Sequence, residues 1–201
     1  MKITELKQQL KRADRFSVYV DHKYCLSLST EELLNAKLYV GLEISETELN
    51  NLNKLAESSL IKAQCFHYLS YRLRSSWEME TYLKRKGYSE ELIKDTLNYL
   101  IDKKLVNDQD FANRWIENRL LLKPTSINIL RLELKQKRIN PDIINDALAE
   151  HDIDELKIIK QLIDKKRQQL KYKDNLKLMQ LLARKGFGYD TIKRALNSTG
   201  D

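Results

Sequence analysis

The amino-acid sequence predicts a mainly α-helical protein built from tandem repeats. The first indication is the scarcity of residues that interrupt secondary structure, because the 201 residues include 5 Gly and 2 Pro. These make up about 3.5 % of the chain, where average usage would give roughly 12 %. An all-β chain needs a turn about every 8–12 residues, and so few breakers do not supply them. The second indication is a charged fraction of 32 %, which is typical of an elongated helical array with a large surface relative to its core.

The third indication is a residue pattern that recurs twice, at offsets of 51 and 48 residues. The three copies read LKRKGYSEELIKDTL from Leu83, LKQKRINPDIINDAL from Leu134 and LARKGFGYDTIKRAL from Leu182. A fixed period of this length is the sequence signature of a repeat architecture. The chain is therefore expected to consist largely of three copies of one helical unit.

The matched positions describe a corner between two helices. Gly87 and Gly186 stand where a left-handed residue ends a helix, and the following Tyr88 is placed to pack on Leu83, as in a Schellman motif. The second copy has Arg138 at the glycine position. A left-handed Arg costs about 1–2 kcal/mol, so a differently built corner remains an alternative there.

Two sets of helix-capping residues recur with the same spacing, which gives three helices per copy. One set precedes the middle helix and the other follows the corner; they are Ser75, Ser126 and Asp174, and Ser89, Asn140 and Gly188. In the first copy the middle helix is expected over about 75–86 and the last helix over about 90–103. The first helices of the three copies are expected at roughly 59–74, 109–122 and 153–170.

The N-terminal residues follow a different pattern. Phe16–Val20 and Tyr24–Leu28 alternate in hydrophobicity around Asp21-His22-Lys23, which predicts a β-hairpin over about 16–29. Residues 3–10 are compatible with a third strand or with a helix. Two short helices are expected to follow, one near 30–40 and one from Ser45 to about 57.

This reading divides the chain into four parts and predicts a short curved solenoid of three three-helix repeats that stack on one another. The parts are an N-terminal extension over 1–57 and three repeats over 58–106, 107–152 and 153–201. The net charge of +7 is unevenly distributed, because the last part alone carries 12 basic and 6 acidic residues. That end of the chain can steer a polyanionic partner, although a merely solvated helix face is the alternative.

Several classes of protein are disfavoured by the sequence. No apolar run is long enough for a membrane span, and the N-terminus lacks the apolar stretch of a signal peptide. Cys25 and Cys65 stand 40 residues apart without a CxxC motif, so neither a disulfide framework nor a zinc site is expected. We therefore expect a cytoplasmic protein, and a monomer as the default.

Catalysis is also not expected, because the phosphate-loop, dinucleotide, nucleophile-elbow and zinc-protease motifs are missing from the sequence. The three histidines fall in three different segments, and none stands at ligand spacing from a Cys or an acid. The sequence therefore predicts a binding protein that uses no cofactor.

Basic residues near the ends of the predicted helices are the candidates for contact with a partner. They are Arg72, Arg74, Lys84, Arg85, Lys86, Arg114, Arg119, Lys165, Lys166, Arg167, Arg184 and Lys185. Cations in the last turn of a helix are also favoured by the helix dipole alone, which is the structural alternative for each of them. Trp77, Tyr82, Phe111 and Trp115 could stack on nucleobases, but their helical spacing favours a place in the core.

The order and spacing of several strings resemble the RecX regulatory family. They are FSVYVDHKYCLSLS (16–29), YLSYRLRSSWEMETYLKRKGYS (68–89), LVNDQDFANRWIENR (105–119) and LLARKGFGYDTIKRAL (181–196), and the resemblance covers essentially the whole chain. It implies a fold of tandem three-helix repeats. It also implies that the protein binds RecA recombinase filaments on single-stranded DNA and modulates them, usually by inhibition.

Two departures from the family pattern lie in loops of the second repeat. Lys137-Arg138-Ile139 replaces a Lys-Gly-Ile corner, and Pro124-Thr125 replaces a turn that usually contains Gly. Two other functions remain open beside the one that the resemblance implies. The first is direct binding of single- or double-stranded DNA by the basic C-terminal half, and the second is a helical scaffold for another protein.

Overall fold

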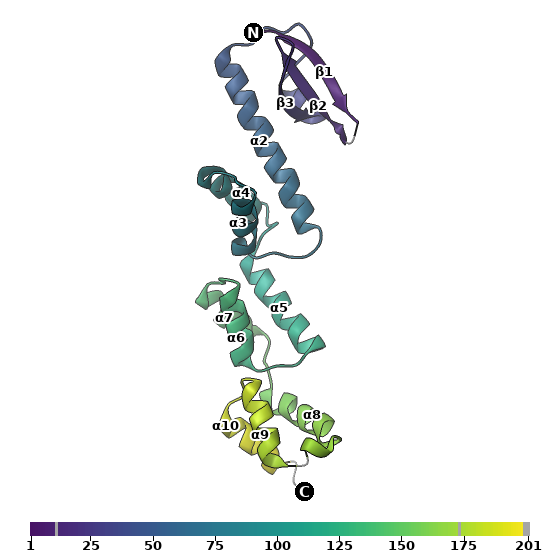
Figure 1. Cartoon of the computed structure of the whole chain (residues 1–201). Coiled ribbons are helices and arrows are strands. Elements are labelled where there is room, and N and C mark those ends of the chain that lie inside the picture. The colour runs from purple at the N-terminus through teal and green to yellow at the C-terminus, as the bar shows by residue number, and fades with distance from the viewer. Residues whose placement is uncertain (11, 173, 199–201) are drawn as a thin grey trace. The chain divides into compact units, whose positions relative to one another are not determined.

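The computed structural model describes residues 1–10, 12–172 and 174–198. It divides into two compact units, which are described separately (Figure 1). Unit 1 comprises Met1–Arg72 together with Tyr88–Tyr99, and unit 2 comprises Leu73–Gly87 together with the chain from Leu100 onward. The mainly helical fold with three three-helix domains and a small N-terminal sheet, predicted from the sequence, is confirmed.

Unit 1 begins with a three-stranded antiparallel sheet in the order β1-β2-β3. The strands are β1 (Ile3–Gln9), β2 (Arg12–Val20) and β3 (Lys23–Ser29). Residues 3–9 are therefore a strand, which decides between the two alternatives that the sequence left open. The predicted hairpin is present, and its turn residues Asp21 and His22 have φ of 47° and 65°. A two-residue turn with positive φ at both positions matches the right-handed twist of the strands.

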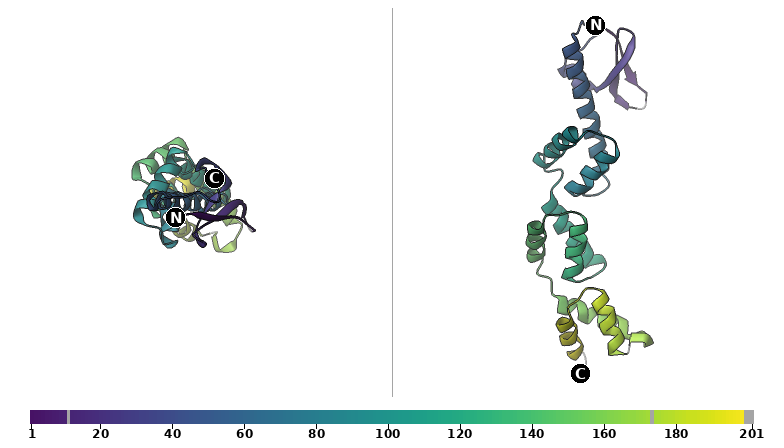
Figure 2. Two further views of the ribbon diagram at one scale, coloured as in Figure 1. Left: turned by 90° about the horizontal axis from the view of Figure 1, so that it is seen from above. Right: turned by 60° about the vertical axis from the view of Figure 1, so that its left-hand side comes forward.

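Two helices cover one face of this sheet, α1 (Thr30–Asn35) and the N-terminal half of α2 (Glu46–Leu69) (Figure 2). Each begins with a complete capping box, formed by Ser29 with Glu32 and by Ser45 with Glu48. The shared core is aliphatic and consists of Ile3, Val18, Val20, Leu26, Leu28, Leu38, Ile44, Leu52 and Ala56.

Helix α2 runs without a break for 24 residues, so the prediction that one helix ends near residue 57 and another begins near 59 is wrong. Its buried residues Leu52, Ala56, Ile61 and Cys65 follow one another at intervals of four or five, so a single apolar face continues through the expected boundary. Ser58 and Ser59 lie inside this continuous helix, because its buried face continues past them. Helix α1, predicted near residues 30–40, is shorter than expected and ends at Asn35.

Unit 2 holds the middle helix of the first repeat and the complete second and third three-helix domains. Its elements are α3 (Ser76–Arg85), α5 (Asp108–Leu122), α6 (Ile127–Gln136), α7 (Pro141–Glu150), α8 (Glu155–Arg167), the 3-10 turn η1 (Leu170–Tyr172), α9 (Asn175–Arg184) and α10 (Tyr189–Asn197); α4 (Glu90–Asp102) belongs to both units. Helices α5–α7 enclose one core around Phe111, Leu134 and Ile144. Helices α8–α10 enclose another around Ile163 and Phe187.

The corner of the second repeat is built like that of the third, although Arg138 replaces a glycine. Arg138 has φ of 57° and Gly186 has φ of 80°. In both corners the next residue closes the helix by donating its N–H to a carbonyl oxygen five residues earlier, Ile139 to Leu134 at 3.2 Å and Phe187 to Leu182 at 3.3 Å. The alternative of a different corner at Arg138 is therefore wrong, because the Schellman hydrogen bonds outweigh the strain of a left-handed Arg.

Candidate binding surfaces

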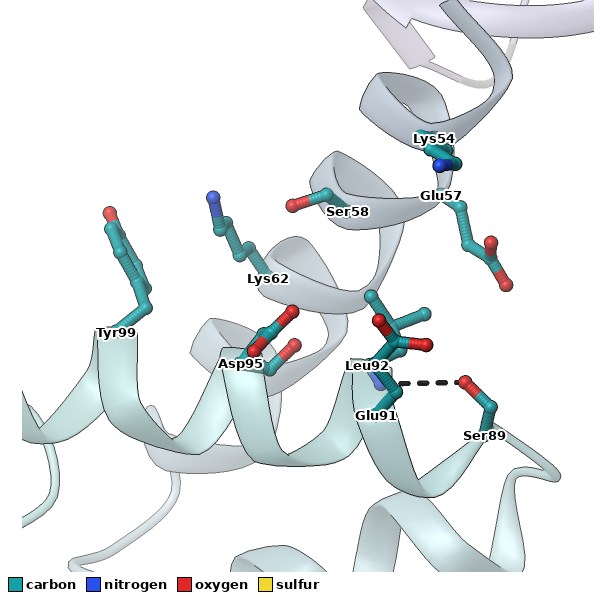
Figure 3. A pocket seen from close by; sticks show the side chains of 10 residues that line it. Lys54, Glu57, Ser58, Lys62, Ser89, Glu91, Leu92, Asp95 and Tyr99 are labelled. Atoms are coloured by element: carbon teal, nitrogen blue, oxygen red, sulfur yellow. Dashed lines mark hydrogen bonds between the residues drawn. The ribbon is translucent and has the colours of Figure 1, made fainter. Parts of the chain in front are cut away.

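A polar groove of about 450 Å³ lies between α2 and α4 in unit 1. Figure 3 shows Lys54, Glu57 and Lys62 of α2 facing Glu91 and Asp95 of α4 across it. The ammonium of Lys62 lies 4.3 Å from the centre of the Tyr99 ring, a cation–π contact. The residues that line the groove include no His, Cys or Arg. The groove therefore has the chemistry of a surface cleft of mixed charge.

The contacts in unit 2 between α3 and the second three-helix domain, called the first junction here, depend on two hydrogen bonds at the start of α3. The Ser75 hydroxyl donates to the carbonyl oxygen of Lys137 at 3.3 Å while accepting the N–H of Glu78. The backbone N–H of Ser76 donates to a carboxylate oxygen of Asp108 at 2.8 Å. The N-terminal turn of α3, whose N–H groups have no partner inside the helix, is thereby joined to the next domain.

The contacts between α6 and the third three-helix domain, called the second junction, repeat this arrangement. The Ser126 hydroxyl donates to the carbonyl oxygen of Lys185 at 2.9 Å and accepts the N–H of Ile129. The N–H of Ile127 donates to Glu155 at 2.7 Å. The middle helices of the first two repeats, α3 and α6, therefore use their N-cap serines both to begin the helix and to bind the corner of the following repeat.

The two junctions differ in charge. In the first junction the Lys137 ammonium lies 2.6 Å from a carboxylate oxygen of Glu78, whose side chain is 8 % exposed. The same ammonium lies 5.2 Å from the centre of the Trp115 ring. Lys137 is thus neutralised inside the protein, and Glu78 has a counter-ion for its buried carboxylate.

The second junction has no such ion pair at the equivalent lysine. Ile129 takes the place of Glu78 in the repeat, and its side chain packs against the corner beside Lys185, since a Cβ on Gly186 would lie 2.8 Å from Ile129 Cγ1. Among the described residues, no carboxylate forms an ion pair with Lys185. Burial, together with the like charges of Lys123, Lys166 and Arg119, lowers the pKa of the Lys185 ammonium.

Three of the basic residues selected from the sequence are therefore brought together at the second junction, namely Arg119, Lys166 and Lys185. Arg119 has its own counter-ion, because its guanidinium makes two hydrogen bonds with Glu133, of 2.9 and 2.8 Å. Lys123, at the end of α5, was not selected. The sequence signal for this site was the absence of an acid opposite Lys185. It becomes visible only when Ile129 is compared with Glu78, its equivalent one repeat earlier.

The other selected residues are not among the charges that act on the Lys185 ammonium. Lys84 pairs with Glu80 at 2.8 Å, and Arg114 approaches Glu117 at 3.8 Å, in both cases along one exposed helix. Such pairs contribute little to stability and offer no binding chemistry of their own. Arg85, Lys86, Lys165 and Arg184 lie at the ends of α3, α8 and α9, where the helix dipole favours them. Arg72, Arg74 and Arg167 also lie at helix ends or in the loop before α3.

The aromatic candidates are largely structural. Phe111 is buried in the core of the second three-helix domain. Trp115 stacks on it with ring centres 5.8 Å apart, and donates its indole N–H to Glu133 at 2.9 Å. Trp77 on α3 is more exposed, at 38 %. The preference for a core role over base stacking is thus confirmed for Phe111, and Trp115 is half-buried with its polar atom satisfied.

Within residues 1–10, 12–172 and 174–198, His, Cys, Asp and Glu side chains form no group of three that could hold a metal ion. In the same part of the chain, no helix has the length and hydropathy needed to cross a bilayer. Cys25 and Cys65 are free thiols.

Four family models match consecutive parts of the chain. The model of the regulatory protein RecX N-terminal domain matches residues 1–45, and those of the first, second and third RecX three-helix domains match residues 62–100, 107–148 and 153–196. The regulatory protein RecX of Bacillus subtilis (strain 168) is 30 % identical, covering 97 % of this chain and 76 % of the relative. That of Geobacillus sp. (strain WCH70) is 31 % identical, covering 99 % and 77 %.

Two solved structures share this fold. A crystal structure of a regulatory protein RecX superposes with a TM-score of 0.75 at 24 % sequence identity, and covers 98 % of both chains. A crystal structure of RecX from Lactobacillus salivarius has a TM-score of 0.63 at 27 % identity, covering 70 % of this chain and 95 % of that one.

Proposed function

The chain belongs to the RecX family of regulatory proteins, and from this premise we propose that it binds the RecA recombinase filament on single-stranded DNA. We propose further that it inhibits the assembly of that filament, its ATP hydrolysis and its strand exchange. The observation that carries the proposal is the match of all four RecX domain models in their proper order along the chain.

The mechanism that we propose is steric and electrostatic, without catalysis and without a cofactor. Three helical domains in tandem can offer several contact points to a polymer whose subunits repeat, and this supports a filament as the partner. The lysines of the second junction support an electrostatic contribution to binding. The protein would act in the cytoplasm as a monomer.

The test is the ATPase activity of the cognate RecA on single-stranded DNA while the chain is titrated well below the concentration of RecA. Suppression at these low ratios is expected, because a protein that blocks growth or destabilises a filament affects many subunits at once. The control measures the binding of the chain to the same DNA without RecA. An unchanged ATPase rate at every ratio, with DNA still bound, would rule out the proposed function.

A second candidate function is direct DNA binding without a recombinase. It is favoured by the basic excess of residues 153–201, which carry 12 basic and 6 acidic residues. Phosphate contacts release counter-ions, so this function predicts an affinity for DNA that falls steeply as salt rises. The affinity for a protein filament that is bound through apolar side chains would decrease less over the same range of salt concentration. Measuring both affinities from about 50 to 200 mM salt separates the two.

A further inference from the structure

The lysine cluster, defined as Lys123, Lys166 and Lys185, is a positive site without an internal counter-ion in the described part of unit 2. Its members come from three elements: the residue that ends α5, the last turn of α8 and the residue that ends α9. Lys166 lies with its ammonium 5.6 Å from the centre of the Tyr172 ring. Lys185 is held in place through its carbonyl oxygen by Ser126.

In the first junction, the lysine at the equivalent repeat position binds a carboxylate. There Lys137, at the same repeat position as Lys185, receives a carboxylate from Glu78 at 2.6 Å. In the second junction that position holds Ile129, and no carboxylate of the described residues forms an ion pair with Lys185. Lys166 and Lys185 are half-buried and Lys123 is exposed. Like charges repel one another, so an incoming carboxylate gains the attraction of several cations at once.

Two exposed leucines lie next to Lys123 in the sequence. Leu121 and Leu122 on the last turn of α5 immediately precede Lys123, and they are 80 % and 79 % exposed. Two leucines with so much of their surface in water are suited to packing against an apolar group of a partner. Together the leucines and lysines fit a ligand that carries carboxylates next to apolar side chains.

We propose that the lysine cluster binds an acidic side chain of a partner protein, which supplies the carboxylate that Glu78 supplies in the first junction, while Leu121 and Leu122 pack on an apolar neighbour of that side chain. Protein carboxylates are preferred to nucleic-acid phosphates because the equivalent lysine of the first junction binds a carboxylate, and because the exposed side chains next to Lys123 are the aliphatic Leu121 and Leu122. The identity of the partner as a RecA filament rests on the proposed function; the carboxylate chemistry does not.

The first test removes the charges. The triple variant Lys123→Gln, Lys166→Gln, Lys185→Gln is compared with a triple variant that loses the same charge elsewhere in the third domain, Lys157→Gln, Lys160→Gln, Lys193→Gln. The probes are RecA filaments on poly-dT, poly-dT alone and poly-L-glutamate. We expect the first variant to bind filaments and poly-L-glutamate about tenfold more weakly than the control variant does, with equal binding of poly-dT.

The second test leaves every lysine in place. Ile129→Glu copies the first junction by placing a carboxylate opposite Lys185, and it should compete with the partner from within the chain. We expect filament binding to fall by a similar factor while the thermal unfolding midpoint is kept or raised. Ile129→Gln, which is similar in size but uncharged, should bind filaments more tightly than Ile129→Glu does.

The outcomes separate the possibilities. A selective loss of poly-dT binding in the first variant would assign the cluster to phosphates and overturn the proposal. Equal behaviour of the two triple variants with filaments and poly-L-glutamate would also overturn it. If the unmodified chain binds no filament, the proposed function fails, and the poly-L-glutamate comparison still decides whether the cluster binds carboxylates.

Discussion

Ser126 donates its hydroxyl hydrogen to the carbonyl oxygen of Lys185 at 2.9 Å, across 59 residues of sequence. The same oxygen of Ser126 accepts the N–H of Ile129 and so begins α6. One side chain therefore caps a helix and joins two domains. Because Ser126 is completely buried, its hydroxyl has no water to replace either partner.

We predict that Ser126→Ala destabilises the chain by about 1–3 kcal/mol, since it removes a cap and leaves a buried carbonyl oxygen with one acceptor site unused. Chemical denaturation of the full chain, followed by circular dichroism, measures the change. The matched control is Ser89→Ala, because Ser89 is an exposed serine whose oxygen accepts only the local N–H of Leu92, at 3.4 Å. Equal losses in the two variants would contradict a role in joining domains.

The glycines of the first and third corners give a second prediction. Both have positive φ, 84° at Gly87 and 80° at Gly186, so Ala at either position is strained by about 1 kcal/mol. At Gly87 an added Cβ would meet nothing within 4 Å, whereas at Gly186 it would lie 2.6 Å from the Ser126 hydroxyl oxygen. We therefore expect Gly186→Ala to cost clearly more than Gly87→Ala, and thermal unfolding of the two variants compares them directly.

Arg138, the left-handed residue of the second corner, gives a related prediction. Replacing it with Gly should stabilise the chain by about 1 kcal/mol, because the strain of an L residue at this φ is relieved. A destabilised Arg138→Gly variant would mean that the Arg side chain itself contributes to the fold.

The ion pair of the first junction gives a third prediction. Lys137 and Glu78 are 2.6 Å apart, and the Glu78 side chain is 8 % exposed. A double-mutant cycle with Glu78→Gln and Lys137→Gln should give a coupling energy of about 1–2 kcal/mol, because the carboxylate is largely removed from water. The exposed pair Lys84–Glu80, whose side chains are 51 % and 39 % exposed, serves as the comparison and should give a few tenths of a kcal/mol. A first-junction coupling no larger than that of the exposed pair would contradict this account.

The repeats, their corners and most helix caps could be predicted because they depend on residues close in sequence. The N-cap role of Ser75 follows from its place before α3, and the left-handed turn at Gly186 follows from a helix ending there. The continuity of α2 was missed, because the expected boundary near residues 57–59 lies between Ala56 and Ile61, which belong to one continuous buried face.

The junctions could not be predicted, because they join residues about 60 positions apart through single side chains. Ser75 and Ser126 recur at matching repeat positions, as do Lys137 and Lys185, but this recurrence does not indicate that each serine hydroxyl donates to the carbonyl oxygen of the lysine in the next repeat. Lys185 was therefore predicted as a binding residue only from its charge and its place at the end of a predicted helix. The structure adds that its neighbours are cationic and that Ile129 stands where Glu78 stands one repeat earlier.

The two cysteines give the last prediction, which concerns pH. Cys65 on α2 is completely buried, and burial raises the pKa of its thiol to about 11. Since the thiolate is the reactive form, only about 0.1 % of Cys65 would be ionised at pH 8. Cys25 on β3 is partly exposed. With a disulfide reagent at pH 8, we expect the native chain to release one equivalent of thiol quickly and the second only after unfolding.

The variant Cys25→Ser isolates the buried thiol. Its reaction should accelerate as the pH rises toward 11, because a group with a raised pKa ionises only there, provided that circular dichroism shows the chain still folded. In denaturant the same variant should react at the rate of an ordinary thiol with a pKa near 8.5. A rapid reaction of native Cys25→Ser at pH 8 would contradict the buried position of Cys65 near the C-terminal end of α2.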